Sequence, residues 1–173
     1  VQALLKSDNP RMRARAIWLL GKTPGQGSKW IRRAASDADP DVRTIAIRLA
    51  RQLADVNELQ VVEELKGDAS AKVRRECLIA LRAHQTSRAA SLWADLAVQH
   101  DGKDRWYLEA LGIASDLNAD ACLAAWLNKV GKNWNSTAGR DIIWRSRSKD
   151  ACDLLAQIVK SSPAEDHPRY MRA

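Results

Sequence analysis

A segment that combines an aspartate, a turn and an arginine recurs along this chain about every 30 residues, and it constrains the fold more than any other feature. The clearest copies are residues 8–13 (DNPRMR), 39–43 (DPDVR) and 68–74 (DASAKVR). Arginines at positions 13, 43, 74 and 105 are separated by 30, 31 and 31 residues. A fifth, weaker copy at residues 139–144 (GRDIIW) is out of step. The chain is therefore expected to repeat one structural unit.

Each copy has the features of a helix start. Asp, Asn or Ser accepts hydrogen bonds from the free N–H groups of a first helical turn, and Pro10 and Pro40 suit the first helical position. Apolar residues then recur with a helical period. A second helix is predicted to follow each first one, over residues 29–35, 56–66, 87–99, 119–130 and 151–160.

The predicted fold class is all-α. About ten helices in five antiparallel pairs would stack into an α-solenoid with a continuous core, because one pair cannot bury both of its faces alone. The residues expected in that core are Val42, Ile45, Leu49, Val73, Cys77, Leu81, Tyr107 and Leu111. The first unit adds the apolar stripe of Met12, Ala16, Leu19 and Leu20.

Two regions are predicted. Residues 1–161 form the repeat domain, and residues 162–173 form a C-terminal tail leading to a further domain. The chain starts at Val1 without a Met, so we expect it to be a piece of a larger protein. Its longest apolar run, Ala121 to Leu127, is much shorter than the roughly 20 residues of a bilayer span, so no membrane insertion is expected.

The unit at residues 39–43, with small alanines behind it, resembles the HEAT repeat. Residues 101–112 (DGKDRWYLEALG), 139–147 (GRDIIWRSR) and 169–173 (RYMRA) are similar to a narrower group, the large multidomain proteins of planctomycetes and their relatives. Those proteins join a propeller-type dehydrogenase domain, a HEAT region and a c-type haem module. The narrower resemblance implies a connecting module in the bacterial cell envelope or periplasm. The chain has no CxxCH motif, so no haem function is carried over.

No set of residues has the spacing of a catalytic, cofactor or metal site. The three histidines, His84, His100 and His167, form no HxxxH or HExxH motif, and Cys77, Cys122 and Cys152 lie far apart. The cysteines are interpreted as small buried apolar residues. We therefore predict no metal, no cofactor and no enzymatic activity.

The repeated arginines allow two interpretations. They line a basic groove, or each one bonds an aspartate or carbonyl group in the adjacent repeat, for which Asp37, Asp39 and Asp68 are well placed. A residue that recurs once per unit is more often involved in stacking, so the structural interpretation is favoured.

Positive charge is concentrated at one end. The chain has 28 Lys and Arg against 21 Asp and Glu, and residues 1–36 hold eight of the bases with Asp8 as their only acid. The rest of the chain is therefore neutral in sum. Five of these bases share helix faces and are the candidate interaction surface: Arg11, Arg15, Lys29, Arg32 and Arg33.

These features favour a non-catalytic scaffold that binds a protein partner or neighbouring domains of its own chain. The alternative is a HEAT-like protein that binds nucleic acid, as some DNA glycosylases do with Trp and a basic groove. A groove binder is expected to carry positive charge on successive repeats, whereas here it lies at one end. A third possibility, a HEAT-type lyase acting on a bilin, lacks a polar cluster to support it.

Overall fold

The computed structural model describes residues 1–171, and every regular element among them is helical. The described residues divide into two compact units, the first ending at Ala80 and the second beginning at Leu81. No helix in the described part is long and apolar enough to cross a bilayer. The proposed division at residue 161 remains a prediction.

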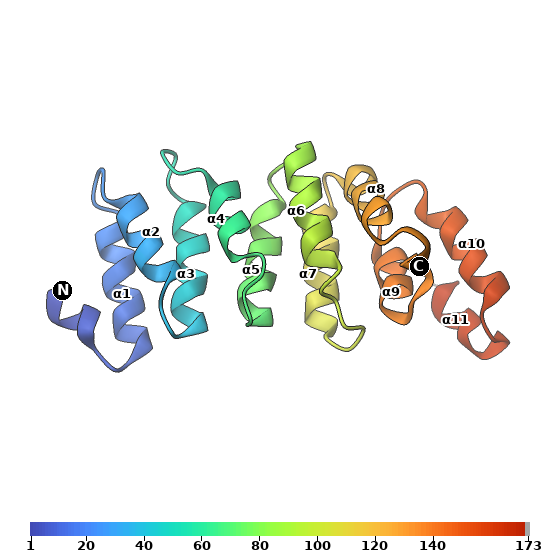
Figure 1. Cartoon of the computed structure of the whole chain (residues 1–173), viewed down its shortest axis with the longest axis horizontal. Coiled ribbons are helices and arrows are strands. Elements are labelled where there is room, and N and C mark those ends of the chain that lie inside the picture. The colour runs from blue at the N-terminus through green and yellow to red at the C-terminus, as the bar shows by residue number, and fades with distance from the viewer. Residues whose placement is uncertain (172–173) are drawn as a thin grey trace. The chain divides into compact units, whose positions relative to one another are not determined.

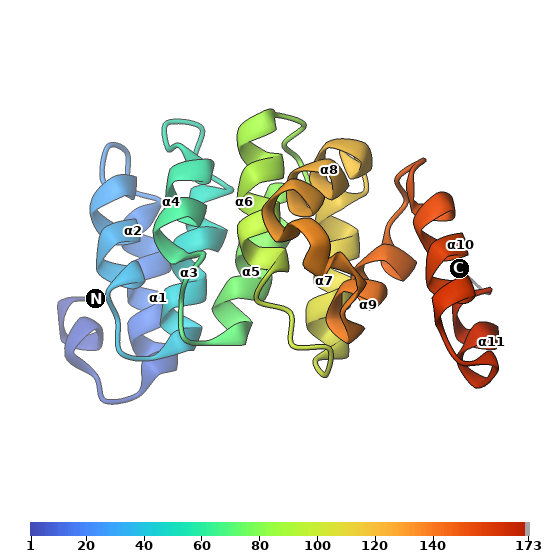
Figure 2. The same ribbon diagram turned by 45° about the vertical axis from the view of Figure 1, so that its right-hand side comes forward.

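The first unit holds one short 3-10 helix and five α-helices. They are η1 (Gln2–Lys6), α1 (Pro10–Gly21), α2 (Gly27–Ala35), α3 (Pro40–Ala50), α4 (Glu58–Leu65) and α5 (Ala71–Leu81), whose last residue lies past the boundary. Figures 1 and 2 show α1, α3 and α5 side by side in one layer, with α2 and α4 in a second layer. Helix α1 packs on both α2 and α3, and α2 packs on α3.

The second unit repeats this alternation. It contains α6 (Ser87–Ala97), α7 (Arg105–Ser115), α8 (Ala119–Val130), η2 (Gly131–Asn135), α9 (Thr137–Arg145), α10 (Ala151–Ser161), η3 (Ala164–Asp166) and α11 (His167–Tyr170). Helix α6 packs on α8 and α7 packs on α9, so alternate helices again share a layer (Figure 1). The predicted all-α fold of paired helices is confirmed.

The helices begin where the sequence places helix-start residues. Asn9 accepts a hydrogen bond from the Arg11 backbone N–H at 3.0 Å, and Asp39 accepts one from Asp41 N–H at 2.8 Å. Pro10 and Pro40 are the first residues of their helices, where no partner for an N–H is needed. The five predicted second helices correspond to α2, α4, α6, α8 and α10, with ends that agree within two residues.

Seven of the eight predicted core residues are buried, with exposed fractions of 2% or less for Val42, Leu49, Val73, Cys77, Leu81, Tyr107 and Leu111. Ile45 was wrongly expected to be buried: it lies at the edge of the packed side of α3 and is half-buried. Leu19 was also wrongly assigned, because it is 60% exposed. The buried side of α1 is centred on Ala16 and Ile17, and Leu19 lies on the other side of that helix.

The predicted tail contains η3 and α11 in its described part. Tyr170 is buried and Met171 is 75% exposed. Arg172 and Ala173, which close the RYMRA segment, lie outside the described residues.

Candidate functional site

The outer face of α1 carries a continuous stripe of basic and apolar side chains, which we call the α1 stripe: Arg11, Arg15, Trp18, Leu19 and Lys22. These positions follow the i, i+4, i+7, i+8, i+11 spacing of one helix face. All are exposed except Trp18, which is half-buried. The Lys22 ammonium lies 4.7 Å from the centroid of the Trp18 ring, a cation–π contact. The stripe therefore presents positive charge and apolar area together.

Helix α2 carries the other three candidates, Lys29, Arg32 and Arg33, all of them exposed. Arg32 lines a hollow of about 310 Å³ whose rim includes Asp55, Asn57 and Glu64. The Arg33 guanidinium lies 3.7 Å from the Asp37 carboxylate, a long contact for an ion pair. The Lys29 ammonium lies 5.2 Å from the Trp30 ring centroid.

Within residues 1–171, four of the five candidates, all but Arg33, form no salt bridge: Arg11, Arg15, Lys29 and Arg32. Beyond residue 36 basic side chains do find acids: Arg43 pairs with Asp68, Arg48 with Glu76, and Lys129 with Asp95. The first helix pair thus keeps a positive charge that its own fold leaves uncompensated. Two of the candidates lie on α1 and three lie on α2. Trp18 and Lys22 were not predicted as site residues from the sequence, although their helical spacing from Arg11 and Arg15 places them on the same face of α1.

A second hollow, of about 360 Å³, adjoins the α1 stripe and is lined by Trp18, Arg48, Arg51, Gln52 and Glu76. Arg48 is fixed there by a 2.6 Å bond to Glu76. Together with the stripe, this hollow gives the layer of α1, α3 and α5 a polar depression near the exposed side chain of Leu19. That combination suits the surface of another protein.

The repeated arginines are structural in the first unit. Arg13 donates from Nε and Nη2 to the two carboxylate oxygens of Asp37, at 3.0 and 2.8 Å. Arg43 does the same to Asp68, at 2.6 and 2.8 Å. Because of these hydrogen bonds, the pKa of each carboxyl group lies below its ordinary value. We call this pairing the arginine clamp.

Each clamp arginine also holds the loop before its own helix. Nη1 of Arg13 donates to the carbonyls of Ser7 and Asp8, and Nη1 of Arg43 donates to those of Asp37 and Ala38. Arg74 repeats this with the carbonyls of Asp68 and Ala69. The carbonyls are always six and five residues before the arginine, so the repeat unit preserves one local geometry.

Arg105 does not belong to this series, although its spacing predicted that it would. Arg13, Arg43 and Arg74 are the fourth residues of α1, α3 and α5, whereas Arg105 is the first residue of α7. The segment before α7, residues 98–104, is longer than those before α3 and α5, residues 36–39 and 66–70, and Gly102 adopts a positive φ of 76° there. The fourth position of α7 is Leu108, and Arg105 is 85% exposed. Arg140, fourth in α9, also reaches the segment before its helix, but its Nε donates to the side-chain oxygen of Asn135, at 2.8 Å.

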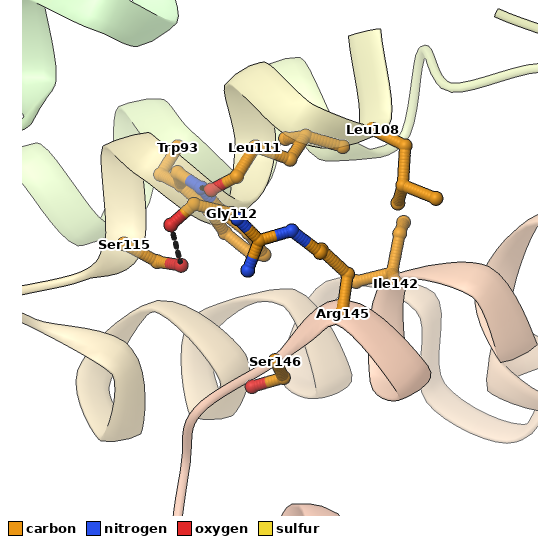
Figure 3. Close-up of a pocket in the computed structure, with 8 residues that line it drawn as sticks. All are labelled: Trp93, Leu108, Leu111, Gly112, Ser115, Ile142, Arg145 and Ser146. Carbon is orange, nitrogen blue, oxygen red and sulfur yellow. Dashed lines mark hydrogen bonds between the residues drawn. The ribbon is translucent and has the colours of Figure 1, made fainter. Parts of the chain in front are cut away.

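A third feature lies in the second unit, where Arg145 of α9 crosses Gly112 of α7 (Figure 3). Arg145 Nε donates to Glu109 at 3.0 Å. A Cβ atom on Gly112 would come within 2.3 Å of the guanidinium carbon. The indole N–H of Trp93, shown in the same view, donates to the carbonyl of Leu111 at 2.9 Å. This close contact is structural and leaves only about 10 Å³ of space.

The histidines and cysteines are scattered. Among the described residues no three His, Cys, Asp or Glu side chains gather as a metal site would require. Cys77 and Cys122 are buried, while Cys152 is exposed, in contrast to the interpretation that all three are buried. Burial raises the pKa of both the Cys77 and Cys122 thiols to about 12. His100 is buried beside Asp141.

Comparison with models of protein families matches residues 1–82 to HEAT repeats. No curated protein and no solved structure matches the chain. The likeness of residues 100–173 to planctomycete proteins is unsupported by these comparisons. HEAT repeats typically mediate protein interactions and are typically non-catalytic. The match over residues 1–82 agrees with the 30-residue repeat and with the stacked helix pairs, so this part of the chain is similar to HEAT repeats in sequence and consistent with them in structure.

Proposed function

We propose that this chain is a non-catalytic scaffold whose first helix pair binds an acidic protein surface. The observation that supports this most is the uncompensated charge of that pair. Residues 1–36 contain eight bases and one acid, and among residues 1–171 two of these bases form salt bridges, Arg13 at 2.8 Å and Arg33 at 3.7 Å, both with Asp37. Folding alone does not require the remaining bases.

The partner is expected to carry apolar groups next to its acids. Leu19, 60% exposed, lies between Arg15 and Lys22 on the α1 stripe, and Trp18 lines the adjoining hollow. Apolar and aromatic groups supply binding energy at the centre of an interface, while charge favours the encounter and the choice of partner. A nucleic acid would pair with the positive charges, but it would offer no apolar surface to cover the exposed side chain of Leu19.

The test measures binding of two fluorescein-labelled probes by anisotropy: a helical peptide with glutamates and leucines on one face, and a duplex DNA of arbitrary sequence. The proposal expects the peptide to bind, and the binding to weaken as salt rises. The variant Arg11→Glu/Arg15→Glu should abolish that binding. Arg32→Glu should weaken it, and Arg33→Gln is preferable to Arg33→Glu because Glu would place a second acid beside Asp37.

The matched control reverses two exposed bases of the second unit, Lys132→Glu/Lys160→Glu, which changes the net charge equally. It should leave peptide binding unchanged. If this control loses as much peptide binding as Arg11→Glu/Arg15→Glu, the binding depends on net charge alone, and the proposal of a defined binding surface is wrong. DNA binding that is tighter than peptide binding and is lost in Arg11→Glu/Arg15→Glu would establish the nucleic-acid alternative instead.

A further inference from the structure

A polar hollow of about 330 Å³ lies in the second unit, away from the basic surface proposed above. It is lined by His100, which follows α6, by residues at the start of α7, and by Asp141 and Trp144 of α9. Helices α7 and α9 pack on one another, so the walls of the hollow are held by the packing of the unit. A volume of this size lies within the range of small-molecule sites in proteins.

Two buried side chains of this hollow have no hydrogen-bond partner within residues 1–171. The His100 side chain is 1% exposed, and neither of its ring nitrogens is hydrogen-bonded. The indole N–H of Trp144 is likewise buried without a hydrogen bond. A buried polar group that lacks a partner is unfavourable, so a molecule in the hollow that supplies the missing partners is bound more tightly.

His100 is held in a fixed orientation. Its ring stacks on that of Tyr107, with centroids 6.1 Å apart and planes 5° from parallel. The Tyr107 hydroxyl donates to the Leu96 carbonyl at 2.9 Å, which fixes the second ring. His100 Nε2 lies 3.8 Å from Oδ2 of Asp141, too far for a direct hydrogen bond. An imidazole carries at least one N–H in its neutral and its charged form, so His100 offers a positioned donor.

The acidic side chains that line the hollow already have partners. Asp104 accepts a hydrogen bond from the Tyr107 backbone N–H at 3.0 Å, and Glu109 accepts one from Arg145 at 3.0 Å. Asp141 has an interaction partner as well. These carboxylates therefore belong to the internal contacts of the unit, and they do not define the ligand.

The groups that remain can all donate hydrogen bonds. Besides Trp144 and His100 they are Lys103, which forms no salt bridge within residues 1–171, and Arg105. The Arg105 side chain is 85% exposed and reaches Glu109 only at 4.0 Å. Arg105 is also the first residue of the 11-residue helix α7, so the positive end of the helix dipole lies at the hollow. A negatively charged acceptor complements this set of groups.

We infer that this hollow binds a small organic acid, whose carboxylate accepts hydrogen bonds from His100 and Trp144 and is attracted by Lys103. One carboxylate can satisfy both buried donors, because its two oxygens accept several hydrogen bonds. Leu108, 7% exposed, and the half-buried ring of Trp144 provide apolar area for a short apolar chain on the acid. A free acid and the C-terminus of a peptide both present this chemistry. The inference is independent of the acidic-partner proposal, because its residues all belong to the second unit.

The experiment follows the indole N–H signals of the ¹⁵N-labelled chain by NMR. Trp144 is assigned from the Trp144→Phe variant, and Trp93 is the internal control because its N–H is bonded to the Leu111 carbonyl. Butyrate represents a free acid, and N-acetyl-glycyl-leucine represents a peptide C-terminus. Butyramide and butylammonium are the neutral and cationic comparisons of similar size. Each compound is added up to about 50 mM, which reaches the weak end of small-ligand affinity.

The inference expects a saturable shift of the Trp144 signal with butyrate or the peptide, and none of the Trp93 signal. The tighter of the two compounds identifies the source of the carboxylate. His100→Phe keeps a ring on Tyr107 but removes both nitrogens, and should weaken binding by roughly tenfold. Lys103→Gln, at an exposed position, should weaken binding too, whereas the matched control Lys132→Gln should not. Lys103→Gln and its control decide the matter if His100→Phe does not fold.

The inference fails if neither carboxylate gives a saturable shift, since water alone then satisfies the two buried side chains. It also fails if butyramide or butylammonium binds as tightly as butyrate, because the negative charge is then not recognised. Binding by His100→Phe and Lys103→Gln that is as tight as that of the original chain would place the acid elsewhere.

Discussion

Arg43 donates two hydrogen bonds to the carboxylate of Asp68, 25 residues further along the chain, at 2.6 and 2.8 Å. The Asp68 side chain is only 7% exposed, so its charge depends on that guanidinium. Arg43→Met should lower the free energy of unfolding by roughly 2 kcal/mol, since hydrogen bonds to a charged group are lost. Urea unfolding measures this. Arg51→Met, whose ion pairs are 3.5 and 3.8 Å long and 40% exposed, is the control with little expected effect.

The same clamps predict how stability depends on acid. The guanidiniums hold the pKa values of Asp37 and Asp68 below the ordinary carboxyl value. Their contribution is therefore fully present above the unfolded pKa, about 3.9, and is lost as the pH falls through the lower folded values. Thermal unfolding between neutral and acidic pH checks this. Asp37→Asn/Asp68→Asn should be less stable at neutral pH and should depend less on pH in the acidic range; an unchanged dependence would contradict the assignment.

Arg11 opposes the stability of its own helix. It is the second residue of α1, whose first turn holds no acid, and it is four residues before Arg15. Arg11→Glu should raise the free energy of unfolding by about 0.5–1 kcal/mol, because an acid suits the helix N-terminus and pairs with Arg15. The comparison variant is Lys160→Glu, in the last turn of α10, which should lower it. A gain in stability together with lost peptide binding would separate function from folding at this position.

Gly112 is required by Arg145. A Cβ atom would lie 2.3–2.6 Å from three guanidinium atoms, so Gly112→Ala must displace the Arg145 side chain from Glu109 and should cost about 1 kcal/mol. In an Arg145→Ala background the same change should instead stabilise the chain by about 0.5–1 kcal/mol, because alanine favours a helix. Thermal or urea unfolding of the four chains measures the cycle. The same sign in both backgrounds would rule out this contact as the reason for glycine.

The three cysteines should differ in reactivity. Cys152 is exposed, whereas the thiols of Cys77 and Cys122 are buried with pKa values of about 12. An aromatic disulfide reagent at mildly alkaline pH should modify one thiol in the folded chain and three in denaturant, because the thiolate is the reactive form. Cys152→Ser should leave no rapidly reacting thiol. Rapid modification of that variant would show that the core around Cys77 or Cys122 opens readily.

The sequence predicted the helices well because their signals are local. Caps such as Asn9 and Asp39, and the apolar period behind them, depend only on neighbouring residues. The aspartate partners of the repeated arginines could also be predicted, because the arginines recur at the length of the repeat and each repeat supplies an aspartate. Arg105 was misplaced because equal spacing cannot reveal that the segment before α7 is longer than those before α3 and α5. The position of an arginine within its helix, and not the interval between arginines in the sequence, decides whether its side chain reaches the preceding loop.

The candidate sites were harder to predict from the sequence. The five basic residues were selected by charge alone, and only the helical packing shows that Leu19 points away from the core and joins them. The hollow around His100 is lined by the segment after α6 and by helices α7 and α9, and His100 and Trp144 are 44 positions apart. No local pattern encodes such an arrangement. Cys152 was misjudged for a similar reason: it lies on the exposed side of α10, whereas its neighbour Ala151 is buried.

The arginine clamp has a direction. The repeats that begin with α1 and α3 each donate from an arginine to an aspartate further along the chain, so the pairs Arg13–Asp37 and Arg43–Asp68 point the same way. A second copy of residues 40–70 inserted after Ser70 would carry its own Arg43 and Asp68 equivalents, so Arg74 would still find two carbonyls and no charge would be stranded. A chain built in this way can lengthen by gene duplication without redesigning a single contact, until a loop such as that at Gly102 ends the series.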